Sequence, residues 1–212
     1  MVRVGLIGEN PNDTSVVAKL LLQKLHGSVD FFPMLNDING DNLDTDHALQ
    51  MIGREYERLR PHLIIYIRDL DVLESDKEKI AKRKAVFKKR NDRVAKKAIL
   101  LLIVVESEAL VLADIDGFLQ YLLIQKLRRE PTLTQEQRET FIQGNKDLLA
   151  HISDPMRESD PKGTLIDAFD YNEGKMPSIA DYLRLDIVAK NHRGFGQFLK
   201  KFNKRFESLR RT

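Results

Sequence analysis

The chain has 212 residues, of which 42% are hydrophobic and 32% are charged, and it contains no cysteine. A chain of this length and composition can bury a sizeable core, and the lack of cysteine excludes disulfides, thiolate zinc sites and cysteine nucleophiles. The longest apolar run, residues 98–105, is too short to cross a bilayer, and the first residues enter a strand pattern and not a signal-peptide profile. We therefore expect a soluble, cytoplasmic protein with no membrane contact.

The net charge of +3 is small, but the charges are unevenly distributed along the chain. Residues 69–76 hold four acids and no base, whereas residues 77–97 hold eleven Lys and Arg against two acids. This separation is typical of a protein that binds a metal ion in one place and a polyanion in another, although a solvated helix face gives the same pattern. The polyanion interpretation predicts contacts to nucleic acid, with DNA as the expected partner, from Lys82, Arg83, Lys84, Lys88, Lys89 and Arg90.

The first half of the chain shows an alternation of strand and helix patterns. Strands are predicted at residues 2–7, 29–34, 63–67 and 99–105, and helices at 14–25, 45–59 and within 77–97. Asp13 is positioned to cap the first of these helices. Such an alternation builds a mainly parallel sheet covered by helices on both faces, so we expect an α/β fold.

The second half of the chain is mostly helical in pattern. Helices are predicted at residues 108–129, 134–152, 178–185 and 194–209, separated by prolines at 131, 155, 161 and 177. We expect residues 1–115 to form the α/β core and residues 116–212 a helical extension packed on it, with a separate helical subdomain as the alternative. Phe195, Phe198 and Phe202 fall at helical spacing, which is typical of a core stripe and, less often, of a nucleic-acid platform.

Acidic residues follow three of the predicted strands. The first strand ends in Glu9, the third in Asp69-Leu70-Asp71, and the fourth in Glu106-Ser107-Glu108, with Asp114 two turns further on. The carboxyl ends of parallel strands share one edge of a sheet, where ligands bind, so these acids are expected to approach one another. Clustered carboxylates raise one another's pKa unless a hard cation such as Mg²⁺ or Mn²⁺ joins them. Asp69 and Asp71 converge only if the chain turns at Leu70.

Each of these features also has a simpler explanation. Glu9 can interact with the amides of the helix that follows it, and acids beside a strand are common. The pair Asp44-x-Asp46 lies in a predicted loop, where turn chemistry explains it. The five histidines lack the spacing of metal ligands, and His26 lies at a helix end where it can cap carbonyls, so none is assigned a role.

Three segments of the chain carry recognisable motifs. Residues 6–13 (LIGENPND) form a hydrophobic strand that ends in glutamate, and residues 66–71 (YIRDLD) form a strand that ends in Asp-x-Asp. These two segments resemble the opening strand and the Asp-x-Asp strand end of the Toprim domain. Residues 104–114 (VVESEALVLAD) are similar to a signature of small bacterial Toprim-like proteins, which are often encoded beside an ATPase and are related to the overcoming-lysogenization-defect nucleases. Asn10 stands where glycine is commoner and Leu110 where an aromatic residue is expected, and neither change removes a proposed ligand.

The resemblance implies a Toprim-like, Rossmann-like core and a nuclease that hydrolyses phosphodiester bonds with Mg²⁺ or Mn²⁺, with phage defence as its context. It implies catalytic roles for Glu9, Asp69, Asp71 and Lys162, the last as a positive charge beside the transferring phosphoryl group. The implied metal ligands are Glu9, Asp13, Asp69, Asp71, Glu108 and Asp114.

Other functions stay open. The Toprim-like core can also be an inactive interaction or sensor module that docks on an ABC-type or AAA-type ATPase. A phospho-acceptor receiver domain also places acids at strand ends, but Glu9-Asn10 is a poor match to its acid pair and no fifth strand carries its lysine. A glycine-rich nucleotide motif is weaker again, because residues 5–8 lack the spacing.

Overall fold

The computed structural model describes residues 1–25, 27–38, 40–152, 154 and 157–211. His26, considered above as a helix cap, and Pro155, considered as a helix boundary, lie outside these residues. None of the helices in the described part of the chain combines the length and hydropathy needed to span a bilayer.

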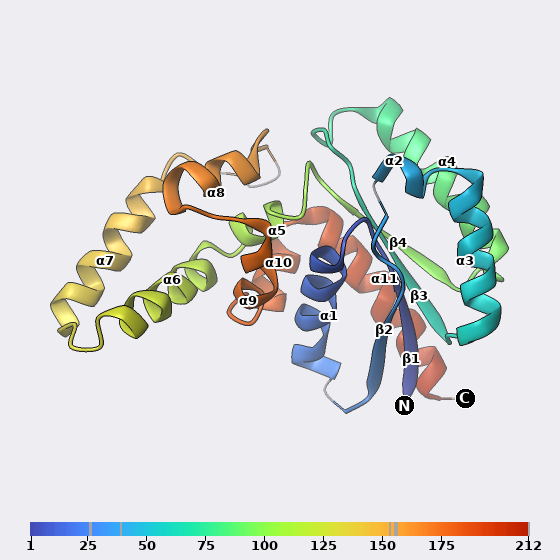
Figure 1. Cartoon of the computed structure of the whole chain (residues 1–212), viewed down its shortest axis with the longest axis horizontal. Helices are drawn as coiled ribbons and strands as arrows, with labels where there is room; N and C mark the ends of the chain where they lie inside the picture. The colour runs from blue at the N-terminus through green and yellow to red at the C-terminus, as the bar shows by residue number, and fades with distance from the viewer. Residues whose placement is uncertain (26, 39, 153, 155–156, 212) are drawn as a thin grey trace.

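Four parallel strands form a single sheet in the order β2-β1-β3-β4 (Figure 1). The strands are β1 (Val2–Ile7), β2 (Val29–Leu35), β3 (Leu63–Asp69) and β4 (Ala98–Ile103). Each lies within two residues of its predicted bounds, because short runs of buried aliphatic residues mark strands that are covered on both faces. The predicted α/β fold with a parallel sheet is confirmed, and it is a Rossmann-like arrangement.

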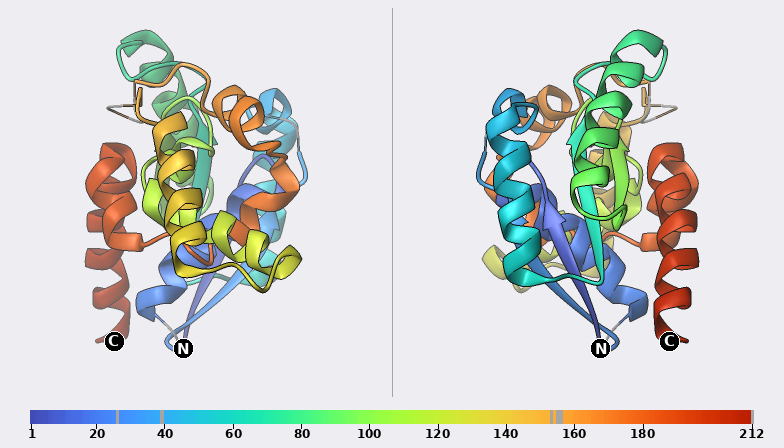
Figure 2. Two further views of the ribbon diagram at one scale, coloured as in Figure 1. Left: turned by 90° about the vertical axis from the view of Figure 1, so that its left-hand side faces the viewer. Right: turned by 90° about the vertical axis from the view of Figure 1, so that its right-hand side faces the viewer.

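Helices cover both faces of this sheet (Figure 2). On one face lie α1 (Pro11–Leu25) and α11 (Arg193–Arg210), whose apolar side chains pack with Val4 and Leu6 in the larger core. On the other face lie α3 (Asp46–Leu59) and α4 (Lys77–Arg93), which enclose a smaller core around Ile7 and Tyr66. The stripe of phenylalanines on α11 is buried in the larger core, as the core interpretation predicted.

The strand order creates a switch point between β1 and β3. The chain leaves β1 toward α1 on one face of the sheet and leaves β3 toward α4 on the other. The two connections therefore diverge and open a crevice beyond the carboxyl ends of these strands, which is where open α/β sheets bind ligands. Glu9 and Asp69 lie at this crevice.

Several helix ends differ from the prediction. Helix α1 begins at Pro11, and the side chain of Asn10, not of Asp13, accepts the first amide hydrogen bonds, from Asn12 and Asp13. Proline at the first helical position favours this earlier start. The predicted helix 108–129 is divided at Asp114 into α5 (Ala109–Leu112) and α6 (Ile115–Arg129).

Further differences lie in the C-terminal half. The region predicted as helix 178–185 contains instead the end of α9 (Met176–Ile179) and the start of α10 (Leu185–Asn191). Short elements without a clear period were not predicted. These are α2 (Gly40–Leu43), α8 (Pro161–Phe169) and the 3₁₀ turn η1 (Glu173–Lys175).

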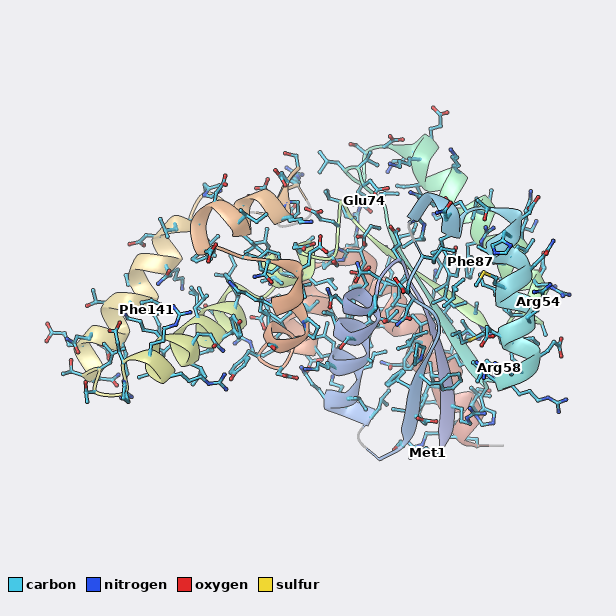
Figure 3. All side chains as sticks on the ribbon, in the orientation of Figure 1. Met1, Arg54, Arg58, Glu74, Phe87 and Phe141 are labelled. Atoms are coloured by element: carbon cyan, nitrogen blue, oxygen red, sulfur yellow. The ribbon has the colours of Figure 1, made fainter. Side chains whose placement is uncertain are left out.

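Helices α6 and α7 (Gln135–Leu148) extend away from the sheet as an arm (Figure 1). Figure 3 shows Phe141 on this arm, far from Phe87 on the opposite side of the sheet. A capping box at Thr134 and Gln137 defines the start of α7, yet no residue of α7 is buried. Apolar residues of α8 to α11 belong to the same larger core as those of β1 and β3.

Candidate functional site

The turns after β3 and β4 are joined by backbone hydrogen bonds. The amide of Asp71 donates to the carbonyl of Val105 at 2.8 Å, and the amide of Val105 donates to Val72 at 3.2 Å. Asp71 and Val105 both have left-handed backbones, with φ of 54° and 59°. This conformation is costly for a β-branched residue such as Val105, so the surrounding contacts must impose it. The turn at Leu70 is therefore present, and it fixes the directions of the acids on either side.

Asp13, Asp69 and Glu108 form an acidic cluster on the α1 face of the sheet edge. Asp13 and Glu108 are each only 3% exposed. Burial, followed by the charges of Asp13 and Glu108, holds the pKa of Asp69 well above its ordinary value. Burial also raises the pKa of Asp13 to about 6, and the charge of Glu108 acts in the same direction. The Oδ1 atom of Asp69 is buried and makes no hydrogen bond among the described residues.

Neutral donors and one lysine surround this acidic cluster. The hydroxyl of Tyr171 donates to Oε1 of Glu108 at 2.8 Å, and the hydroxyl of Ser107 donates to Oε2 at 3.3 Å. Burial and then the charge of Glu108 raise the pKa of Tyr171, which keeps its proton available for this bond. The backbone amide of Lys162 donates to Glu106 at 2.8 Å, while its ammonium group pairs with Glu173. Lys162 thus lies beside the acidic cluster with its charge already partnered.

Glu9 and Asp71 lie in a different environment, beside arginines. The carboxylate of Glu9 contacts the buried guanidinium of Arg68, which also pairs with Asp44 at 3.2 Å. Arg83 of α4 contacts the same oxygen of Asp44 and donates to Asp71 at 2.8 Å. We call Arg68, Asp44 and Arg83 the arginine bridge, because they link the carboxylates of Glu9 and Asp71 through alternating charges.

Asp114 does not join the acidic cluster. Its carboxylate is buried and accepts hydrogen bonds from the backbone amides of Gly117, at 3.2 Å, and Arg184, at 2.6 Å, and it pairs with the Arg184 guanidinium. These contacts cap α6 and account for the charge, so we exclude Asp114 from the candidate metal ligands. The sequence showed an acid in a helical pattern but not the arginine 70 residues away that binds it.

Two of the six predicted nucleic-acid contacts face inward. Arg83 is 8% exposed and Arg90 is 3% exposed, whereas Lys82, Lys84, Lys88 and Lys89 are exposed. Arg90 donates to the backbone carbonyls of Leu43 and Thr45. Positions 83 and 90 are seven residues apart and therefore share one helix face, which α4 turns toward the sheet. Arg83 and Arg90 were predicted to contact nucleic acid, but both are buried, and they anchor the α2–α3 connection through Asp44, Leu43 and Thr45.

The carboxylates at this site can be compared with the ligands that a divalent metal ion requires. Within the described ranges, no three acidic, histidine or cysteine side chains are close enough as they stand to hold an ion. The acidic cluster nevertheless fits a hard divalent cation, because its carboxylates repel one another and Asp69 has an unpaired buried oxygen. The residues that suit such an ion are Asp13, Asp69 and Glu108. No family model, curated protein or solved structure matches the chain.

Sequence reasoning missed the residues that determine these environments. Arg68 had a visible signal, since it is the only basic residue in the strand Leu63–Asp69 and follows five residues without charge. Asp44 was assigned to turn chemistry, and Tyr171 carried no signal at all. Their partners lie 24 and 63 residues away along the chain, a separation that periodicity does not report.

Proposed function

We propose that the protein is a Mg²⁺-dependent or Mn²⁺-dependent nuclease of Toprim-like type, in which Asp13, Asp69 and Glu108 hold the ion. The observation that carries this proposal is the acidic cluster, in which the buried carboxylates of Asp13, on α1, and Glu108, before α5, lie near enough to Asp69 at the end of β3 to raise its pKa. Burying like charges is unfavourable, and a divalent cation removes that cost. The resemblance to Toprim segments supports the same chemistry.

The arrangement assigns different tasks to the residues around the site. A bound divalent ion would supply an activated water and stabilise charge on the phosphoryl group. Tyr171 and Ser107 orient the carboxylate of Glu108, which is how outer partners commonly fix a ligand. Lys162 lies next to Glu106 and places a cation near the site, available to a phosphoryl group if Glu173 releases it.

A metal titration tests this proposal directly. We expect Mn²⁺ to bind the wild-type protein in calorimetry and to raise its melting temperature, and nucleic acid to be cleaved only in its presence. Asp69→Asn removes the acid at the centre of the acidic cluster, so it is expected to abolish the metal response while raising stability in EDTA by about 1 kcal/mol through relief of charge repulsion.

Asp167→Asn is the matched control, because Asp167 is an exposed acid on α8. It is expected to leave metal binding and cleavage unchanged. The metal assignment fails if Asp69→Asn binds Mn²⁺ as tightly as the wild type. Cleavage that persists in both variants without added metal rejects the nuclease proposal itself.

A second candidate function is an interaction module that docks on an ATPase. Two observations favour it: the arginine bridge already neutralises Glu9 and Asp71, and α7 buries none of its residues. A module of this kind would show no Mg²⁺ or Mn²⁺ binding in calorimetry and no cleavage, and the same titration therefore separates the two functions.

A further inference from the structure

Two buried arginines converge on one carboxylate oxygen at the switch point of the sheet. Arg68 is 2% exposed and Arg83 is 8% exposed, and both contact Oδ2 of Asp44. Arg68 extends from the end of β3, and Arg83 extends from α4 on the same face. The guanidinium groups are thus held in place by the sheet and by a seventeen-residue helix.

Asp44 satisfies these arginines incompletely. The Nε atoms of Arg68 and Arg83 are buried and make no hydrogen bond among the described residues, and the same holds for Oδ1 of Asp44. Buried polar groups without partners are rare in proteins and call for an explanation such as an ion or a ligand. A carboxylate has two oxygens in one plane, whereas two guanidinium groups offer up to ten N–H donors. A tetrahedral oxyanion can accept hydrogen bonds from two guanidinium groups in different directions better than a planar carboxylate can.

The position of Asp44 allows a ligand to replace it. Its side chain is 20% exposed, so the contact between the two arginines is reachable from solvent. Arg90 binds the carbonyls of Leu43 and Thr45 on either side of it. The backbone therefore stays anchored while the side chain of Asp44 rotates away. Without Asp44, each arginine keeps one carboxylate, Glu9 for Arg68 and Asp71 for Arg83.

We propose that Arg68 and Arg83 form a phosphate-binding site, and that Asp44 occupies the place of the phosphate when no ligand is bound. Arginine forks suit phosphate oxygens, and a dianion between two guanidinium groups gains charge-assisted hydrogen bonds that Asp44 leaves unmade. The site lies at the crevice where open α/β sheets bind ligands. It needs no metal ion, so it is independent of the proposed nuclease activity.

Phosphate titration of an Asp44 variant tests this site. Asp44→Asn removes the competing charge and nearly preserves the side-chain shape, so we expect it to bind inorganic phosphate at least ten-fold more tightly than the wild type. The measurement is calorimetry in EDTA at constant ionic strength, with chloride as the reference anion. A parallel titration with a nucleoside 5′-monophosphate distinguishes the source of the phosphate: tighter binding of the nucleotide indicates a phosphomonoester ligand, and equal affinity indicates free phosphate.

Two further variants control for charge and for the arginine. Asp46→Asn removes an exposed acid from the same connection and is expected to leave phosphate affinity unchanged. Asp44→Asn combined with Arg83→Gln is expected to lose the gain. Equal phosphate affinity of Asp44→Asn and the wild type overturns the proposal, as does a gain that survives in the double variant. If Asp44→Asn unfolds in chloride, refolding in phosphate supports the site, and failure to refold in either salt overturns it.

Discussion

At the scale of single residues, His192 shows how a buried ionisable group makes stability depend on pH. It is fully buried, its Nδ1 accepts the amide of Phe195 at 3.0 Å, and burial lowers its pKa to about 4. The folded protein therefore binds a proton less tightly than the unfolded chain, whose histidine has a pKa near 6.5. Lowering the pH through this range favours unfolding.

We expect the free energy of unfolding to fall by about 1–2 kcal/mol between pH 7 and pH 5 because of His192. His192→Asn keeps a side chain that can cap α11 but cannot take up a proton. The decrease in the free energy of unfolding that His192 causes between pH 7 and pH 5 should therefore be absent in this variant. Urea denaturation at both pH values measures it. His47→Asn, at an exposed histidine, is the control and should retain the wild-type pH dependence; a wild-type dependence in His192→Asn would refute the assignment.

At the scale of elements, Asp114 decides where one helix ends and the next begins. Its carboxylate accepts hydrogen bonds from the amide of Gly117 in α6 and from the amide and side chain of Arg184, just before α10. Asp114→Ala leaves the buried amide of Gly117 and the amide of Arg184 without their acceptor, so we expect a loss of about 1–3 kcal/mol in the free energy of unfolding. Asp116→Ala, two residues away and 62% exposed, should cost less than about 0.5 kcal/mol. Similar losses for the two variants in urea denaturation would contradict this role.

The cationic side chains of helix α4 fall into a buried group and an exposed group. Arg83 and Arg90 stabilise the fold, while Lys82, Lys88 and Lys89 are exposed and remain candidates for phosphate contacts. If these lysines bind nucleic acid, replacing all three with glutamine should reduce the slope of log affinity against log salt by about 2–3. Replacing the exposed Lys200, Lys201 and Lys204 of α11 removes the same charge and should leave the slope unchanged. Equal slopes in the two triple variants would locate the binding surface elsewhere.

At the scale of the whole molecule, stability is unevenly distributed between the sheet and the arm. Helix α11 buries five residues in the larger core, whereas α7 buries none. Elements with few buried contacts open locally without global unfolding. We expect the amides of α7 to exchange with solvent at least ten-fold faster than those of α11, measured by hydrogen exchange and mass spectrometry. Comparable protection of the two helices would contradict this uneven distribution of stability.

The sequence alone determined that the first half of the chain alternates strands and helices and that its strands form a parallel sheet. Short aliphatic runs at residues 2–7, 63–67 and 99–105 marked buried parallel strands, because such strands are covered on both faces and need no polar alternation. It also placed acids at three strand ends, since the carboxyl ends of parallel strands share one edge. Short helices and helix ends were missed, because their start depends on caps and not on period.

Only the tertiary structure decided which acids meet. Along β3 the side chains alternate between the two faces, so Asp69 points to the α1 face and Arg68 to the α4 face. Beyond the turn at Leu70, Asp71 pairs with Arg83 on α4. The partner of each charge comes from an element tens of residues away, and the free energy of a charge pair depends on distance and burial, which no local pattern contains.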